Sequence, residues 1–331
     1  MIPTGPRPTT LAVAAALGTV YLVWGSTYLA IAFVVDTMPP LLAAGVRFLV
    51  AGLTLVAFLV ARERWRRRRG TGGGLTWPRA VEWRTAIIVG ALLLLGGNGM
   101  VMIAEQTIPS GIAAVILATT PIWLSIFDAL LTRRTPSRLA IGGLVVGLAG
   151  VGILLMPSSG IDSFDPVGIG ILVVAEVCWA SGSLYARRGP LPHNHLLGTG
   201  MEQLSGGLLL LAVGIALGEV GRFDPAAVTS TSLLGLAFLI VFGSLAAFTA
   251  YVWLLNHVAV TTVATYAYVN PVVAVALGVA FNGETLTPRS LLAAALIIGA
   301  VVAMVSGRPR DVEESGPSPD AATLEAESEA G

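Results

Sequence analysis

The sequence contains no lysine, a single cysteine and few charged residues of any kind. Of its 331 residues, 19 are basic, all of them arginine, and 11% are charged, against about 25% in an average soluble domain. A phosphate-binding P-loop and a Schiff-base enzyme each need a lysine, so both are excluded within this chain. Because Cys178 is the one cysteine, no disulfide can form within the chain, and the compartment cannot be read from cysteines.

The sequence is instead rich in long hydrophobic runs. Hydrophobic residues make up 55% of the chain, and the mean hydropathy is +0.83. Apolar runs near the roughly 20 residues that cross a bilayer recur from end to end. The run at 11–35 is too long for the apolar core of a signal peptide, and only Arg7 precedes it. The chain is therefore predicted to be an all-α, multi-pass integral membrane protein.

The apolar runs and the short links between them predict ten transmembrane helices. The links are rich in glycine, proline, serine and aspartate, and they leave no room for an extramembrane domain. The predicted spans are 11–35, 40–60, 85–104, 110–131, 139–156, 167–187, 197–218, 233–255, 258–281 and 290–306.

Arginine placement gives the orientation. With ten spans and the N-terminus in the cytoplasm, 16 of the 19 arginines fall on the cytoplasmic side, as positive-inside topology requires. Both termini are then cytoplasmic. The inside set is Arg7, Arg62, Arg64, Arg66, Arg67, Arg68, Arg69, Arg79, Arg84, Arg133, Arg134, Arg138, Arg187, Arg188, Arg308 and Arg310.

The ends of the chain and the basic loop carry less information. Residues 1–10 are predicted to be a cytoplasmic N-terminus, and residues 307–331, which hold seven of the 19 acidic residues, a disordered cytoplasmic tail. The arginine run at 62–69 is interpreted as a topology signal that touches the anionic lipid bilayer, and not as a nucleic-acid site.

Two blocks of the sequence repeat each other. The first carries TTPI at 119–122 and small residues at 143 and 147; the second carries VNPV at 269–272 and small residues at 295 and 299. The two prolines are 150 residues apart (121 to 271). Because each half would hold five spans, the halves, 11–156 and 167–306, are predicted to be inverted repeats, a common architecture of secondary transporters.

Two tryptophan motifs lie at mid-span, where tryptophan is unusual. Membrane tryptophans gather at the headgroups, but WGSTY at 24–28 and WASGS at 179–183 fall at the middle of the first and sixth spans. Small and hydroxylated neighbours favour a central cavity, with close helix packing as the alternative. Pro121 and Pro271, also at mid-span, are predicted helix kinks that free the carbonyls of Leu117 and Ala267. The kinks are either structural or part of a shared site.

Three charges lie well inside the predicted spans, whereas Asp128 and Glu105 lie near span ends, where their side chains can reach water. A central charge costs roughly 2.5–3.5 kcal/mol on insertion scales, so such residues are functional candidates. Glu176 is near the centre of its span, and Glu202 and Arg47 lie farther from the centres of theirs. For Glu176 and Glu202, substrate binding or a proton relay stands beside a structural ion pair. Arg47 has the same structural alternative.

Common catalytic and metal-binding patterns are absent from the sequence or weak in it. HExxH, GxSxG and paired CxxC motifs are absent, and His193 with His195 is a weak metal pattern without a third ligand. The chain is accordingly predicted not to be an enzyme and to need neither cofactor nor metal.

The motifs resemble those of the EamA family of the drug/metabolite transporter superfamily, and the pattern is closest to its YedA-type members. The resemblance covers residues 11–306. It rests on 24–28, 39–48, 97–100 and 109–121 in the first half, and on 179–185, 266–271 and 283–286 in the second.

The resemblance implies a ten-helix carrier of the cell (inner) membrane, usually an exporter of amino acids, related metabolites or drugs, that works without ATP or metal. Arg47, Asn98, Glu105 and Glu202 fall at positions that match the family pattern. The chain departs from it at Arg133, where the first half often has a glutamate equivalent to Glu284. It departs again at Glu176, where a small or neutral residue is common.

The sequence therefore predicts a secondary transporter that exports a small-molecule substrate by alternating access, with a proton as the candidate coupling ion. A non-transporting membrane sensor or assembly scaffold is the alternative, and the substrate, the direction of transport, the coupling ion and the oligomeric state are left open. The predicted cavity residues are Trp24, Ser26, Tyr28, Arg47, Asn98, Trp179, Tyr185, Glu202, Tyr266 and Asn270.

Overall fold

A computed structural model describes residues 9–71, 76–132, 138–155, 165–192, 194–258, 263, 265–283 and 285–306. Throughout these ranges the regular structure is helical. Several features predicted from the sequence lie outside the described residues: the N-terminus 1–8, Arg133, His193, Glu284 and the acidic tail 307–331.

The first half of the chain forms a series of long helical runs. Three of them contain more than one segment, because a π-helical stretch or a break interrupts the α-helix. The elements are α1 (Thr10–Thr19), η1 (Val20–Trp24) and α2 (Gly25–Val35); α3 (Pro40–Arg68); α4 (Ala80–Val89), η2 (Gly90–Gly99) and α5 (Met100–Ala104); α6 (Ser110–Leu117) and α7 (Thr120–Thr132); and α8 (Arg138–Leu155).

The second half repeats this order with two short elements added after its second helix. The elements are α9 (Pro166–Arg188); α10 (His195–Ala216); α11 (Glu219–Arg222) and the 3-10 turn η3 (Pro225–Ala227); α12 (Ser230–Phe238), η4 (Leu239–Ala247) and α13 (Phe248–His257); α15 (Tyr266–Asn282); and α16 (Pro288–Ser306).

Among the described residues, six helical runs are long and apolar enough to cross a membrane. They are 10–35, 40–68, 80–104, 166–188, 195–216 and 230–254, and shorter apolar helical stretches lie at 110–124, 269–282 and 291–300. The six runs coincide with the predicted first, second, third, sixth, seventh and eighth spans. The predicted fourth span is divided by a break at 118–119, which separates α6 from α7.

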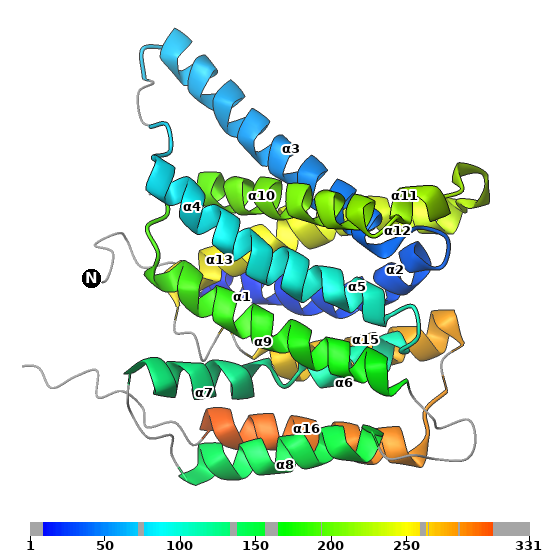
Figure 1. The fold of residues 1–331 in the computed structure, drawn as a ribbon. Coiled ribbons are helices and arrows are strands. Elements are labelled where there is room, and N and C mark those ends of the chain that lie inside the picture. Colours follow the sequence, from blue (N-terminus) through cyan, green and yellow to red (C-terminus); the bar gives the residue numbers. More distant parts are fainter. Residues whose placement is uncertain are drawn as a thin grey trace, which may run out of the picture.

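The helices pack in matched pairs drawn from the two halves. The α3 helix packs along α10, and α8 packs along α16. In Figure 1, α8 and α16 lie side by side at one edge of the bundle, while α3 leans away at the opposite edge. Between them, α9 packs against η2 and α7, and the run 10–35 packs against α12, η4 and α15.

Glycines allow α3 and α10 to approach each other closely. A Cβ atom on Gly52 would lie 2.8 Å from the backbone nitrogen of Leu204, and one on Gly207 would lie 2.7 Å from that of Leu49. In lipid, small residues at such contacts let van der Waals packing hold helices together. The opposite side of α10 meets the η2 run in the same way, since a Cβ on Gly90 would lie 2.7 Å from the nitrogen of Gly206.

Three π-helical segments, η1, η2 and η4, lie inside the membrane-length runs. A π turn leaves a wider backbone ring, and such segments are frequent at functional sites. Side chains reach backbone carbonyls in all three segments. Asn98 Nδ2 donates to the Leu93 carbonyl at 3.4 Å within η2, and Gln203 Nε2 donates to the Ser244 carbonyl in η4 at 3.1 Å. The apolar sequence of these runs gives no sign of the π turns.

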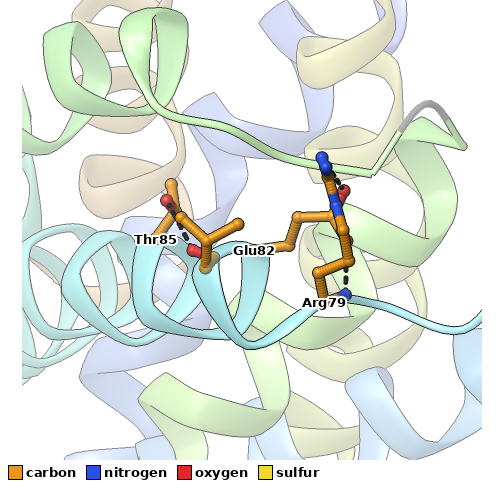
Figure 2. Close-up of polar contacts among 4 residues, drawn as sticks. Arg79, Glu82 and Thr85 are labelled. Atoms are coloured by element: carbon orange, nitrogen blue, oxygen red, sulfur yellow. Dashed lines mark hydrogen bonds and ion pairs between the residues drawn. The ribbon is translucent and has the colours of Figure 1, made fainter.

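The start of α4 is fixed by a local ion pair. Figure 2 shows Glu82 bent back over the first turn, where its carboxylate accepts the backbone N–H of Arg79 at 2.6 Å. The same carboxylate accepts from the Arg79 guanidinium at 3.2 Å. A carboxylate in the first turn also faces the positive end of the helix dipole. Together these contacts set where the third membrane-length run begins.

Candidate functional site

A cavity of about 80 Å³ lies between helices of both halves. It is well above the roughly 10–15 Å³ that one water molecule needs. Its walls come from the run 10–35, α3, the η2 run, α6–α7, α9, α13 and α15. The lining residues are Trp24, Thr27, Tyr28, Ile31, Arg47, Phe48, Gly97, Asn98, Val101, Leu117, Thr120, Ala175, Glu176, Trp179, Phe248, Tyr266 and Asn270.

Aromatic rings form one wall of the cavity, with Trp24 at their centre. The ring of Trp24 lies 4.8 Å from that of Tyr251 and 5.4 Å from that of Tyr266, the latter nearly perpendicular at 87°. It meets Trp179 edge-on at 6.0 Å. Edge-to-face aromatic pairs at these separations contribute about 0.5–1.5 kcal/mol each beyond the area they bury. This wall is therefore held in place by its own contacts.

Arg47 brings a positive charge into the cavity from α3. Its side chain is 3% exposed, its Nε donates to Ser244 Oγ at 2.8 Å, and its Cζ lies 4.6 Å from the centre of the Phe48 ring. Gly243 leaves room for the guanidinium, since a Cβ there would lie 3.0 Å from Arg47 Nη2. The Nη1 atom has no hydrogen-bond partner among the described residues. Arg47 is therefore held at one edge while donors on its other edge stay free.

Glu176 brings an acidic group into the same cavity from α9. It is 2% exposed, and its side chain lies beside that of Thr120. Its second oxygen, Oε2, has no partner in the described part of the chain. A buried polar atom without a partner is costly, so the cavity is lined by one basic and one acidic side chain that each have an unsatisfied atom.

The two mid-span prolines shape the cavity in different ways. In the first half, the kink predicted at Pro121 is a complete break between α6 and α7, and the hydroxyl of Thr120 donates to the Leu117 carbonyl at 2.7 Å. That carbonyl is the one that Pro121 leaves without an N–H. In the second half, α15 continues through Pro271.

Asn270 lies next to the second of these prolines and joins α15 to the run 10–35. With its amide nitrogen turned toward the carbonyls, it donates to Tyr21 O and Tyr266 O at 3.2 Å each. The acceptor Tyr21 O belongs to the π-helical segment η1. Asn270 therefore links a cavity wall of the second half to one of the first.

Seven of the predicted cavity residues line this cavity together: Trp24, Tyr28, Arg47, Asn98, Trp179, Tyr266 and Asn270. Glu176, predicted as a proton-relay residue, lines it as well.

Three predicted cavity residues, Ser26, Tyr185 and Glu202, lie outside the lining. The Ser26 hydroxyl donates to the carbonyls of Leu22 and Val23 on its own helix. Tyr185, nearly two turns beyond Trp179, is 36% exposed. Glu202 is buried, at 4% exposed, but it belongs to α10, which packs on α3 and η2 and contributes no lining residue.

Sequence reasoning missed three residues of the α12–α13 run. Ser244 holds Arg47, Phe248 lines the cavity, and Tyr251 completes the aromatic wall. A weak signal was present in the sequence, because the small pair at 243–244 is followed by aromatic residues one and two helical turns later. Only the fold shows that these residues face Arg47 and Trp24.

The fold and the cavity define a helical membrane protein with a small, mostly apolar cavity between its two halves, which a few buried polar and ionisable side chains line. The chain belongs to the EamA-like transporter family, whose family model matches residues 10–156 and 166–306. It is a membrane protein of the drug/metabolite transporter superfamily.

Named relatives agree with this membership. The chain is 39% identical over 294 residues to the uncharacterized inner membrane transporter YedA of Escherichia coli (strain K12), covering 88% of this chain and 90% of YedA. It is 27% identical over 226 residues to the threonine/homoserine exporter RhtA of the same strain, covering 67% and 71% of the two chains. A solved crystal structure, 19% identical, matches 89% of this chain and 96% of its own with a TM-score of 0.59. At that identity the structural match concerns the fold alone.

Proposed function

We propose that the protein is a secondary transporter that exports small metabolites, amino acids or drugs by alternating access, without ATP. The observation that carries the proposal is a cavity between the two halves, lined by a buried arginine and a buried glutamate that each have an unsatisfied side-chain atom among the described residues. Intramembrane charges facing a cavity are typical of substrate and ion pathways. The alternative, a sensor or scaffold, predicts a bundle without such a cavity.

Ten spans arranged as two inverted five-helix repeats are part of the proposal. Its support is the pattern of helix contacts. Exchanging the halves maps the contact of the run 10–35 with η4 onto that of α9 with η2, and it maps the pairs α3–α10 and α8–α16 onto themselves. The segments η2 and η4 also begin 149 residues apart (90 to 239), close to the spacing of the prolines.

We further propose a location in the inner membrane with both termini in the cytoplasm. Arginine sorting supports the orientation, and the description of YedA as an inner membrane transporter supports the compartment. Export, rather than import, is supported by the description of RhtA as a threonine/homoserine exporter.

Reconstituted protein tests transport. Proteoliposomes loaded with a radiolabelled metabolite panel should show flux that Asn98→Leu abolishes, because an apolar side chain then replaces a polar lining group. The matched control is Thr54→Leu, an exposed position of α3, which should keep wild-type flux. Absence of flux across the whole panel, in both directions, would contradict the proposal.

Proton coupling has two candidate carboxyls, and the cavity separates them. Glu176 faces the lining and Glu202 does not, so we assign the coupling proton to Glu176. An imposed pH gradient should accelerate wild-type and Glu202→Gln flux and leave Glu176→Gln flux unchanged. Loss of the gradient response in Glu202→Gln alone would move the assignment to α10.

A further inference from the structure

We propose that a second pocket, beneath the charged end of α3, binds one phospholipid with an anionic headgroup, whose phosphate lies between Arg64 and Arg67. This lipid pocket shares no residue with the central cavity, so the inference goes beyond the proposed function and does not depend on transport. Its lining residues are Val56, Leu59, Val60, Glu63, Arg64, Arg67, Thr76, Trp77, Pro78 and Leu197.

The lipid pocket lies where the last turns of α3 separate from the helices beside them. In Figure 1, the end of α3 projects away from α10 and α4, and the segment 76–79 leads into the start of α4. The pocket has a volume of about 180 Å³, against about 80 Å³ for the central cavity. Since one water molecule needs roughly 10–15 Å³, the pocket has room for a group of several non-hydrogen atoms.

The lining changes from apolar to charged along α3. Apolar side chains line the pocket between 56 and 60, and charged side chains line it between 63 and 67. About 20 residues of helix cross the roughly 30 Å of hydrocarbon in a bilayer, and α3 begins at Pro40. On this helix the hydrocarbon therefore ends near Val60. The lipid pocket spans the boundary at which a phospholipid changes from acyl chain to headgroup.

Two exposed tryptophans mark the same level. Trp65 and Trp77 are 53% and 84% exposed, and Trp77 lines the lipid pocket. Tryptophan in membrane proteins gathers at the headgroups, where one end of the ring is apolar and the other is wet. Both side chains therefore indicate that this part of the chain lies among lipid headgroups.

The apolar floor of the lipid pocket is well packed. Leu59 and Leu197 form a buried cluster with Ala86 and Met201, which joins α3, α4 and α10. This cluster holds the floor in place without filling the pocket. An acyl chain that lies on it buries apolar surface, which a soluble phosphate cannot do.

The rim above this floor carries a surplus of positive charge. Residues 62–84 contain eight arginines and two glutamates, hence a net charge of +6. Such a surplus attracts anionic lipids and gives little attraction to a headgroup that also carries an ammonium group. The charge of the rim therefore favours an anionic phospholipid over a zwitterionic one.

Two arginines of the rim are placed to hold a phosphate. The Nε atom of Arg67 donates to Glu63 Oε1 at 3.0 Å, which orients its guanidinium. Arg64 forms no ion pair with a described residue. The two side chains are three residues apart, so they are neighbours on one face of α3. Guanidinium groups bind phosphate through parallel N–H groups, and this pair offers two of them to one headgroup.

The test is retention of lipid by the purified full-length protein, measured by native mass spectrometry after delipidation. Phosphatidylglycerol and phosphatidylcholine with identical acyl chains are added separately. We expect one phosphatidylglycerol to be retained per protein and phosphatidylcholine to be retained far less. Glycerol 3-phosphate, which lacks the acyl chains, should not displace the lipid at equal concentration. Equal retention of both lipids, or displacement by glycerol 3-phosphate, would overturn the proposal.

A pair of arginine variants separates a built site from general charge attraction. Arg64→Gln should weaken retention of phosphatidylglycerol at least about tenfold, because it removes a phosphate contact. Arg66→Gln is the matched control, since Arg66 is also exposed and belongs to the same run but does not line the lipid pocket. It should retain lipid like wild type. Equal weakening in both variants would show non-specific attraction and contradict the site.

A second pair tests the space and keeps every charge. Val60→Trp places a large ring in the lipid pocket and should abolish retention, whereas Leu53→Trp, at an exposed position of α3, should not. Melting curves without lipid show whether each variant is folded. Unchanged retention in a folded Val60→Trp would place the lipid elsewhere and refute the assignment.

The acidic residues of 307–331 are the competing occupant of the same arginines. If the protein retains phosphatidylglycerol only after the seven acidic side chains of this segment are replaced by their amides, the segment itself occupies the site and the proposal is wrong. Retention by the unmodified chain supports the lipid.

Discussion

The run 10–35 and α9 each open one half of the chain, and each places a tryptophan in the cavity wall. Trp24 and Trp179 are 155 residues apart (24 to 179), and the same offset pairs Tyr21 with Glu176. Tyr21 hydrogen-bonds through its hydroxyl to Thr265, whereas Glu176 contacts Thr120 and keeps Oε2 unpartnered. The first run contains a π-helical segment, and α9 is a regular α-helix.

This difference shows that the two halves are alike in helix packing but not in their polar side chains. Corresponding helices of the two halves make corresponding contacts, whereas the polar side chains at corresponding positions make different contacts. The phenol at position 21 is hydrogen-bonded and stabilises a helix contact, whereas the acid at position 176 lines the cavity with one oxygen that has no partner among the described residues. The two halves therefore share their helix arrangement but contribute different polar groups to the interior.

The largest expected effect compares the two tryptophans. Trp24→Ala removes a ring that contacts four other aromatic rings, while the ring of Trp179 contacts two. The unfolding free energy should fall by about 3–5 kcal/mol in Trp24→Ala, and by clearly less in Trp179→Ala, because fewer contacts are lost. Thermal unfolding in detergent measures both. Trp65→Ala, at an exposed site, is the control, and equal losses at positions 24 and 179 would refute the asymmetry.

The next effect concerns the break that only the first half contains. Thr120→Val leaves the Leu117 carbonyl without its donor and should cost about 1–3 kcal/mol of stability. Pro121→Ala restores a backbone N–H that can serve this carbonyl, so Thr120→Val should cost less in that background. A double-mutant cycle on melting curves measures the difference. Additive effects would show that the hydroxyl does not compensate for the proline.

A smaller effect contrasts the two equivalent positions 21 and 176. Tyr21→Phe removes one hydrogen bond and should cost about 0.5–1.5 kcal/mol of stability while flux stays near wild type. Glu176→Gln should leave the melting temperature close to wild type and reduce flux about tenfold, since it removes the acidic group of the proposed transport cavity. Proteoliposome flux and melting curves on the same preparations separate the two. A loss of flux in Tyr21→Phe equal to that in Glu176→Gln would break the comparison.

The smallest effect lies at the first turns of the two opening helices. Thr9 caps α1 through its hydroxyl, and Asp165 caps α9 by accepting the N–H of Val167 at 2.9 Å. This hydrogen bond lowers the pKa of Asp165 below its usual value. The stabilisation from the ionised cap is therefore present above about pH 4, the unfolded value, and is lost as the pH falls through the lower folded value.

Comparing wild type with Asp165→Asn at neutral and acidic pH measures this cap. The wild-type advantage in melting temperature should shrink on acidification, while the difference between wild type and Thr9→Ala should not change with pH. A constant advantage for wild type over Asp165→Asn would show that the ionised cap has no part in it.

Most of the helical order could be predicted from the sequence, because apolar runs of membrane length have few alternatives to a helix in lipid. The runs 10–35 and 166–188 lie within a residue of their predicted bounds. A kink at Pro121 was predicted, but not that it would be a complete break at 118–119. The π-helical segments could not be predicted, because they depend on which carbonyls find partners on neighbouring helices, such as Ser244 O with Gln203.

For the candidate site, the position of a residue along its span was informative, but the direction in which its side chain points could not be predicted. Position within a span identified Trp24, Trp179 and Arg47, because polar or amphipathic side chains are unusual inside the bilayer. It could not tell that α10 turns Glu202 toward other helices, because Glu202 and Arg47 look equally deep in the sequence. Ser244 was missed because a serine in an apolar span has no signature until its partner is known.

The π-helical segments mean that part of the polar surface of this bundle is made of backbone. Carbonyl oxygens of Tyr21, Leu93, Gly243 and Ser244 accept hydrogen bonds from side chains although they lie within apolar runs. Hydropathy assigns these runs to lipid, and exchanging their side chains leaves the carbonyls in place. Mutational scanning will therefore underestimate how polar the interior is, and evolution can change every residue of such a turn while the acceptors persist.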